Sequence, residues 1–274
     1  MFNIMSIETF LVSYLNTLNR TGKKYQIGGT KKFTITYKNH KYVFVKLERF
    51  MATDDDIITL YSYDDNTRDC VTLSIERNNK AVILTSFGSD NGCYHEESNI
   101  GSNLLKITLK MIEKYKDKLG VDKILLSDNS TYMCSVDKMK YNMGIMMTLL
   151  TGDTWYGKYG FRPYENYKLN KVQNKIYNEN KEIMTTITMD KINLKKYLLK
   201  IHKKYPEEMT KDMVYKLLKK QNDNPNKLLI TFLNELHGKD VFDSTCHLFY
   251  VYYQRLFNDI GLKIAGHIYG KMLY

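Results

Sequence analysis

The chain has 274 residues, of which 43% are hydrophobic and 13% aromatic, and this composition excludes a globally disordered protein because it suffices to bury a core. The formal net charge of +11, most of which arises after residue 164, suits a polyanionic partner. The sequence has neither an apolar run of about 18 residues nor a secretory signal at its N-terminus. We therefore expect a cytoplasmic protein without membrane contact.

The four cysteines are scattered along the sequence. They stand at positions 70, 93, 134 and 246, without a Cys-x-x-Cys pair or a spacing typical of disulfide-rich proteins. This pattern predicts reduced thiols in a reducing compartment. The histidines near Cys93 and Cys246 lack the partners and the spacing of a zinc site, so we expect no bound metal.

The first third of the chain combines one helix with a series of strands. Apolar residues at helical spacing predict an amphipathic helix over residues 6–19. Runs of β-branched and aromatic residues predict strands at residues 33–37, 42–45, 57–63, 70–75 and 81–87, with a turn at Asn39-His40. Because the connections are too short for parallel crossovers, we expect an antiparallel meander.

The central third predicts a helix between two parallel strands. Ser98 or Asn99 is a candidate N-cap for this helix, and Gly120 ends it. The apolar run Lys123–Ser127 reads as a buried strand that pairs with Ala81–Phe87 through a βαβ crossover. A second helix over residues 138–150 leads to Gly152, and a further strand starts at residues 161–163.

From about residue 190 the pattern is helical to the end of the chain. Apolar residues recur at helical spacing from Leu194, after the cap candidate Thr210, from Leu228, and after the cap candidate Ser244. The polar run Asn174–Glu182 reads as a separator. We therefore expect an α/β domain over residues 1–172 and a basic helical subdomain over residues 173–274.

The order of these elements resembles the GNAT family of N-acetyltransferases, in which an antiparallel sheet feeds a strand–loop–helix–strand–helix–strand series. The segment Asn99–Leu105 resembles the pyrophosphate loop of that family, and Trp155–Phe161 resembles its aromatic–Tyr–x–x–x–Gly–Phe signature. The resemblance covers about residues 55–165 and implies a GNAT-like, mostly antiparallel sheet flanked by helices. The Leu-Thr-Gly-x-Thr-Trp-Tyr segment with its following Gly-Phe is also similar to uncharacterised proteins of large DNA viruses, which adds the host cytoplasm or the virion as expected locations.

The resemblance assigns coenzyme binding to the start of the central helix. Unpaired backbone amides at a helix N-terminus bind phosphate, and glycine lets a pyrophosphate approach the backbone closely. Acetyl-CoA would be the acyl donor, and the residues implied in binding it are Asn99, Ile100, Gly101, Ser102, Asn103 and Leu104. Asn99 replaces the first glycine of the family, and Glu96 replaces its Arg or Gln. The carboxylates of Glu96 and Glu97 would each disfavour a bound pyrophosphate by about 1 kcal/mol.

The second motif supplies the candidate catalytic acid. In the family the tyrosine protonates the departing thiolate of coenzyme A, and Tyr156 takes that position. The general base that receives the amine proton is harder to place, and the candidates are Asp90, beyond the strand Ala81–Phe87, and Asp128, after the strand Lys123–Ser127.

Three functions follow from these patterns. The leading one is acyl-CoA-dependent N-acetyltransfer to an amine that the sequence does not identify. The first alternative is a GNAT-like protein without catalysis that serves in binding or as a structural, virion-associated protein. The second alternative is a nucleic-acid-binding module that uses the lysines of the C-terminal helices.

Overall fold

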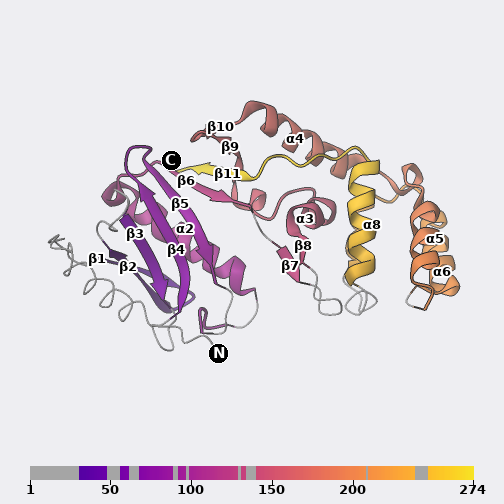
Figure 1. Ribbon diagram of the computed structural model, residues 1–274, viewed down its shortest axis with the longest axis horizontal. Coiled ribbons are helices and arrows are strands. Elements are labelled where there is room, and N and C mark those ends of the chain that lie inside the picture. Colours follow the sequence, from indigo (N-terminus) through magenta and orange to yellow (C-terminus); the bar gives the residue numbers. More distant parts are fainter. Residues whose placement is uncertain are drawn as a thin grey trace, which may run out of the picture. The chain divides into compact units, whose positions relative to one another are not determined.

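The computed structural model in Figure 1 describes residues 31–47, 56–61, 68–88, 92–96, 99–128, 131–133, 140–207, 209–237 and 246–274. These residues form a nine-stranded, mostly antiparallel sheet and seven α-helices, which confirms the mixed α/β class. The helix expected over residues 6–19 lies outside the described residues. None of the helices in the described ranges is long and apolar enough to cross a membrane.

The chain divides into two compact units, described here one at a time. Unit 1 comprises residues 1–127 with residues 271–274, and unit 2 comprises residues 128–270. The boundary expected at residues 172/173 falls inside helix α4 (Lys171–Thr186). The expected separator over residues 174–182 is therefore wrong. One face of α4 buries Tyr177, Asn180 and Met184, and a stripe with so few apolar members escapes a search for apolar periodicity.

Unit 1 begins with the expected meander. Strands β1 (Lys31–Tyr37), β2 (His40–Leu47), β3 (Asp56–Tyr61), β4 (Asp69–Glu76) and β5 (Ala81–Phe87) pair in sequence order, and each pair is antiparallel. The β1–β2 turn consists of Lys38 and Asn39, at φ 47° and 65°, and Tyr37 faces His40. The predicted turn at Asn39-His40 is therefore wrong by one residue, because a two-residue hairpin turn of this type needs both central residues at positive φ.

The expected βαβ crossover completes unit 1. Helix α2 (Ile100–Leu119) ends at Gly120, whose φ of 69° lets the backbone turn back on the last carbonyls of the helix. Strand β6 (Lys123–Ser127) runs parallel to β5, in register from Ala81 opposite Lys123 to Leu84 opposite Leu126. This pairing confirms the predicted crossover.

Unit 2 begins with a short hairpin and a helix. Strands β7 (Thr131–Met133) and β8 (Lys140–Asn142) pair with each other, and helix α3 (Met143–Thr151) follows. The helix expected from residue 138 therefore starts later. Asn142 is the reason, because its side chain accepts a hydrogen bond from the Ile145 N–H and fixes the helix start.

Strands β9 (Arg162–Glu165) and β10 (Lys168–Leu169) follow a short 3₁₀ turn, η1 (Gly157–Tyr159). Helix α4, a second 3₁₀ turn, η2 (Met189–Lys191), and the helices α5 (Leu194–Lys204), α6 (Lys211–Asn222), α7 (Leu229–His237) and α8 (Cys246–Asp259) come next. Thr210 caps α6 as predicted, since its hydroxyl accepts a hydrogen bond from the Met213 N–H. Ser244 lies outside the described residues. The helices share one core, to which Leu149, Met184, Leu198, Phe232 and Leu256 belong.

The last segment of the chain is a strand, β11 (Ile268–Met272), and the prediction of helix to the end is wrong. The sheet has the order β1-β2-β3-β4-β5-β6-β11-β9-β10, so the last strand is inserted between two earlier ones. Tyr269 faces Pro163 and Gly270 faces Arg162 across the β11–β9 pair. Five residues with a central glycine give too weak an alternation to be recognised as a strand.

Cys70 and Cys93 form a disulfide, which contradicts the expected reduced thiols. The two residues are 23 positions apart and both side chains are buried. The bond ties the segment before α2 to β4. Sequence spacing could not reveal this pair, because the fold alone brings the two sulfur atoms together.

Reduction of this disulfide should lower the free energy of unfolding by about 3 kcal/mol, because the cross-link restricts a loop of this length in the unfolded chain. Urea denaturation with and without reductant measures the difference. The Cys70→Ala/Cys93→Ala double variant is the control, since reductant should leave its midpoint unchanged. An unchanged midpoint for the unsubstituted protein would contradict the prediction.

Candidate functional site

The Trp155–Phe161 motif forms a tight turn between α3 and β9 in unit 2. Gly152 ends α3 at φ 72° and Gly160 precedes β9 at φ 88°, so both glycines occupy left-handed positions. Between them, the Gly157 N–H donates to the carbonyl and the hydroxyl of Thr154, at 3.1 and 3.0 Å. The guanidinium of Arg162 donates to the carbonyl oxygens of Gly157 and Phe161, at 3.3 and 2.8 Å. These bonds fix the turn that carries Tyr156.

Tyr156, the candidate acid, is held by aromatic side chains of the same turn. Its ring centroid lies 4.7 Å from that of Trp155 and 6.0 Å from that of Phe161, in edge-on arrangements. The side chain is only 7% exposed. Its hydroxyl forms no hydrogen bond with the part of the chain that the structure describes. A buried phenol that is not engaged by its own fold is available for a ligand.

The surroundings of Tyr156 keep its hydroxyl protonated. Burial, with a further contribution from the negative charge of Asp128, raises the pKa of Tyr156 to about 12. At neutral pH the phenol is therefore fully protonated and has a proton to donate.

Asp128, the alternative base candidate, lies at the start of unit 2. Its N–H donates to the His267 carbonyl at 2.7 Å, and one carboxylate oxygen lies 3.7 Å from where a Cβ on Gly144 would stand. The carboxylate is thus beside the first turn of α3, where the positive end of the helix dipole favours an anion. In the structure the negative charge of Asp128 is near enough to Tyr156 to raise the pKa of its hydroxyl. Asp90, the other base candidate, lies outside the described residues.

A hydrogen bond between Tyr177 and Asp153, made beside the Cα of Gly157, also holds the turn in place. The Tyr177 hydroxyl of α4 donates to Asp153, and Lys181 lies 3.5 Å from the other oxygen of that carboxylate. A Cβ on Gly157 would overlap both Asp153 and the Tyr177 hydroxyl. Arg162 lies over the Tyr177 ring, 4.8 Å from its centroid. Sequence reasoning missed this pair, because Asp153 is the variable position of the Leu-Thr-Gly-x-Thr-Trp-Tyr segment and Tyr177 lies 24 positions further along the chain, outside any motif.

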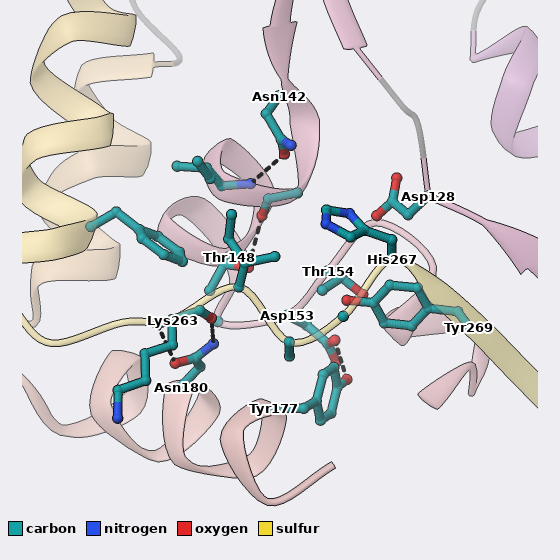
Figure 2. A pocket seen from close by; sticks show the side chains of 17 residues that line it. Asp128, Asn142, Thr148, Asp153, Thr154, Tyr177, Asn180, Lys263, His267 and Tyr269 are labelled. Carbon is teal, nitrogen blue, oxygen red and sulfur yellow. Dashed lines mark hydrogen bonds between the residues drawn. The ribbon is translucent and has the colours of Figure 1, made fainter. Parts of the chain in front are cut away.

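A small cavity lies beside this turn within unit 2 (Figure 2). Its volume of about 30 Å³ is room for one or two water molecules. Figure 2 shows the Tyr269 hydroxyl directed at Thr154. Burial raises the pKa of Tyr269 most, and the negative charges of Asp128 and Asp153 raise it further. Asn180 in its wall exchanges two hydrogen bonds with the Lys263 backbone, at 2.6 and 3.1 Å. Tyr156 is not among the lining residues. The residues around the cavity thus hold the turn in place, and the cavity itself is too small for an organic substrate.

The predicted pyrophosphate site lies at the start of α2 in unit 1. Asn99, one of the two predicted N-cap residues, is the N-cap at φ 58°, but its side chain makes no capping hydrogen bond. The alternative, Ser98, lies outside the described residues. Asn99 instead supplies the left-handed conformation that glycine usually provides. Its carbonyl accepts the Asn103 N–H at 3.0 Å, which leaves the amides of residues 100–102 without a partner inside the helix.

The six predicted binding residues differ in exposure. Asn103 and Leu104 are buried, with Asn103 accepting the Tyr37 hydroxyl at 3.3 Å. Asn99 is exposed, and a Cβ on Gly101 would meet no atom within 4 Å. A ligand could therefore reach the start of α2 at Asn99 and Gly101.

The Glu96 carboxylate, which disfavours an anion here, is paired. It lies 2.6 Å from the Lys38 ammonium, and this carboxylate, through its hydrogen bond, raises the pKa of Lys38. The surrounding segment is fixed by the Cys93 disulfide and by His95, whose ring is stacked on His40 at 3.9 Å. In the described ranges, no three His, Cys, Asp or Glu side chains gather as metal ligands would.

Comparison of the chain with protein-family models, with characterised proteins and with solved structures found no match.

Gly157→Ala should lower the free energy of unfolding by about 1–3 kcal/mol, because the added methyl group separates Asp153 from Tyr177 and leaves partly buried polar atoms unpaired. Chemical denaturation measures this loss. Gly101→Ala is the matched control, and it should be neutral or stabilising by up to about 1 kcal/mol because its Cβ enters open space in a helix. In Tyr177→Phe, where the bond is already absent, Gly157→Ala should cost less. Equal stability of Gly157→Ala and the unsubstituted protein would contradict the proposed overlap.

Asp128→Asn should lower the pKa of Tyr156, because removal of the carboxylate charge makes the tyrosinate less unfavourable while burial continues to raise the value. Since the folded pKa of about 12 exceeds the ordinary 10.0, this tyrosine contributes stability that is complete below pH 10 and lost as the pH rises through 12. Ultraviolet titration of tyrosinate formation, with Tyr156→Phe subtracted, reports the pKa. An unchanged value would show that Asp128 does not act on this hydroxyl.

Proposed function

We propose that the protein is an acyl-CoA-dependent N-acetyltransferase. The observation that carries this proposal is Tyr156, a buried residue whose hydroxyl is protonated and without a hydrogen bond to the described residues. A general acid must have a proton at working pH and must not be committed to another acceptor, and Tyr156 meets both conditions.

The order of elements also supports the proposal. The antiparallel strands β1–β4 lead into β5, a loop, helix α2, strand β6, helix α3 and strand β9, with the β7–β8 hairpin before α3. This is the strand–loop–helix–strand–helix–strand series of the GNAT resemblance.

The start of α2 is suited to the pyrophosphate of acetyl-CoA. Three amides of its first turn have no partner in the helix, Gly101 leaves the approach open, and Lys38 compensates the charge of Glu96. Asn99 adopts a left-handed conformation, at φ 58°, which glycine adopts readily. These features answer the part of the objection that concerns Glu96, while Glu97 lies outside the described residues.

The reaction needs one proton donor and one proton acceptor. The amine nitrogen attacks the thioester carbonyl carbon, the carbon–sulfur bond breaks, and the Tyr156 hydroxyl gives its proton to the departing sulfur. The proton lost by the nitrogen goes to a base, for which Asp128 is the candidate among the described residues, either directly or through water. The base then releases its proton to solvent, and Tyr156 takes up a proton from solvent.

Tyr156→Phe should lower kcat by about 10²- to 10⁴-fold with little change in the affinity for acetyl-CoA, because only the departing thiolate needs the phenolic proton. Thiol release measured with a panel of primary amines gives kcat, and calorimetric titration with acetyl-CoA gives the affinity. Tyr159→Phe, in the same turn, is the matched control and should retain activity. An unaffected kcat in Tyr156→Phe would remove Tyr156 from the mechanism.

One observation favours a second function, a binding protein on the same fold without catalysis. Glu96 and Asn99 stand where the resemblance expects Arg or Gln and glycine. The calorimetric titration separates the two functions, since the absence of heat at millimolar acetyl-CoA would reject the transferase and leave the binding protein, whether or not it is virion-associated.

A further inference from the structure

Helix α2 carries a row of four lysines on its exposed side, Lys106, Lys110, Lys114 and Lys118, here called the α2 lysine row. The four residues are spaced by four positions, so their backbone positions advance by about 6 Å each along the helix axis and the row extends over about 18 Å. All four side chains are exposed. A regular line of cations of this length is suited to a linear polyanion.

The α2 lysine row is not neutralised by its own unit. None of the four lysines forms an ion pair with a carboxylate anywhere in the described ranges. Other lysines of unit 1 do form such pairs, namely Lys38, Lys46, Lys123 and Lys271. Glu113, one of the two acidic residues of α2, lies 3.2 Å from Lys271, so its negative charge is neutralised by a lysine outside the row. The row therefore keeps its positive charge.

Two tyrosine rings lie along the row, and β1 fixes both of them. Lys110 lies 5.6 Å from the centroid of the Tyr37 ring, while Lys114 and Lys118 lie 5.1 and 5.7 Å from that of Tyr115. The Tyr115 hydroxyl donates to the Thr34 carbonyl of β1 at 3.0 Å. Both residues are partly exposed, and the Tyr115 ring also lies 5.1 Å from that of Phe33.

We infer that the α2 lysine row, with Tyr37 and Tyr115, binds single-stranded nucleic acid. Ammonium groups in line contact successive phosphates, and exposed ring surface stacks on unpaired bases, a combination that does not depend on base sequence. A membrane surface fits less well, because none of the large apolar side chains that unit 1 exposes in the described ranges lies on α2 or β1. The inference is independent of the proposed acetyl transfer and uses different residues from the C-terminal helices considered above.

Fluorescence anisotropy with a labelled oligo-dT strand of about 12 nucleotides tests the inference on the full chain. Four phosphate contacts predict a slope of log affinity against log salt of about −3, which is about a 50-fold loss of affinity between about 50 and 200 mM salt. K106Q/K110Q/K114Q/K118Q should remove most of this slope. K195Q/K200Q/K203Q/K204Q on α5, with the same loss of charge, is the matched control and should retain it.

Tyr115→Leu adds a test that depends on the ring and not on charge. It should weaken binding about five- to a hundred-fold without changing the salt slope, whereas Tyr115→Phe should retain the affinity. Circular dichroism checks that each variant is folded. The inference is overturned if the strand does not bind at about 50 mM salt, if only the α5 variant loses the slope, or if a duplex of the same length binds at least as tightly as the single strand.

Discussion

The hydrogen bond between Tyr177 and Asp153, made across the bare Cα of Gly157, is the contact on which the candidate catalytic turn depends. It joins helix α4 to the loop after α3, and it closes only because residue 157 has no side chain. Lys181 lies 3.5 Å from the other oxygen of the Asp153 carboxylate. Together these contacts hold Asp153 and Tyr177 beside Gly157, the residue that follows Tyr156. The turn is held by these other groups, and the Tyr156 hydroxyl forms no hydrogen bond with the described residues.

In unit 1 the start of α2 is organised by backbone conformation and not by a side-chain cap. Asn99 adopts a left-handed conformation, and the first amides of the helix remain without partners in it. The preceding segment is fixed by the Cys70–Cys93 disulfide on one side and by the stacked rings of His95 and His40 on the other. The proposed binding of an anion at this helix start would depend on such support, because the donors must be oriented before the ligand arrives.

Charge has different roles in different parts of the fold. Asp56 is almost fully buried and lies 2.7 Å from Lys46 and 2.6 Å from Arg77, so this carboxylate and its cations are used inside unit 1. Glu96 and Lys38 compensate each other at the protein surface. The α2 lysine row has no carboxylate counterpart in the described ranges, and of its four lysines Lys114 donates to the Thr34 carbonyl at 3.4 Å. The net basic charge of the sequence does not distinguish these cases.

The sequence by itself determined the meander, the βαβ crossover, the turn around Tyr156 and the faces of α5 and α6, because periodicity and turn residues act over a few neighbouring positions. It failed at α4, at β11 and at the disulfide. The apolar stripe of α4 is thin, β11 is a strand only because it pairs beside β9, and Cys70 meets Cys93 only in the folded sheet. Tyr156 was recognised from a local motif. The burial that raises its pKa, the charge of Asp128 and the support by Tyr177 arise from contacts between distant residues, which only the tertiary structure decides.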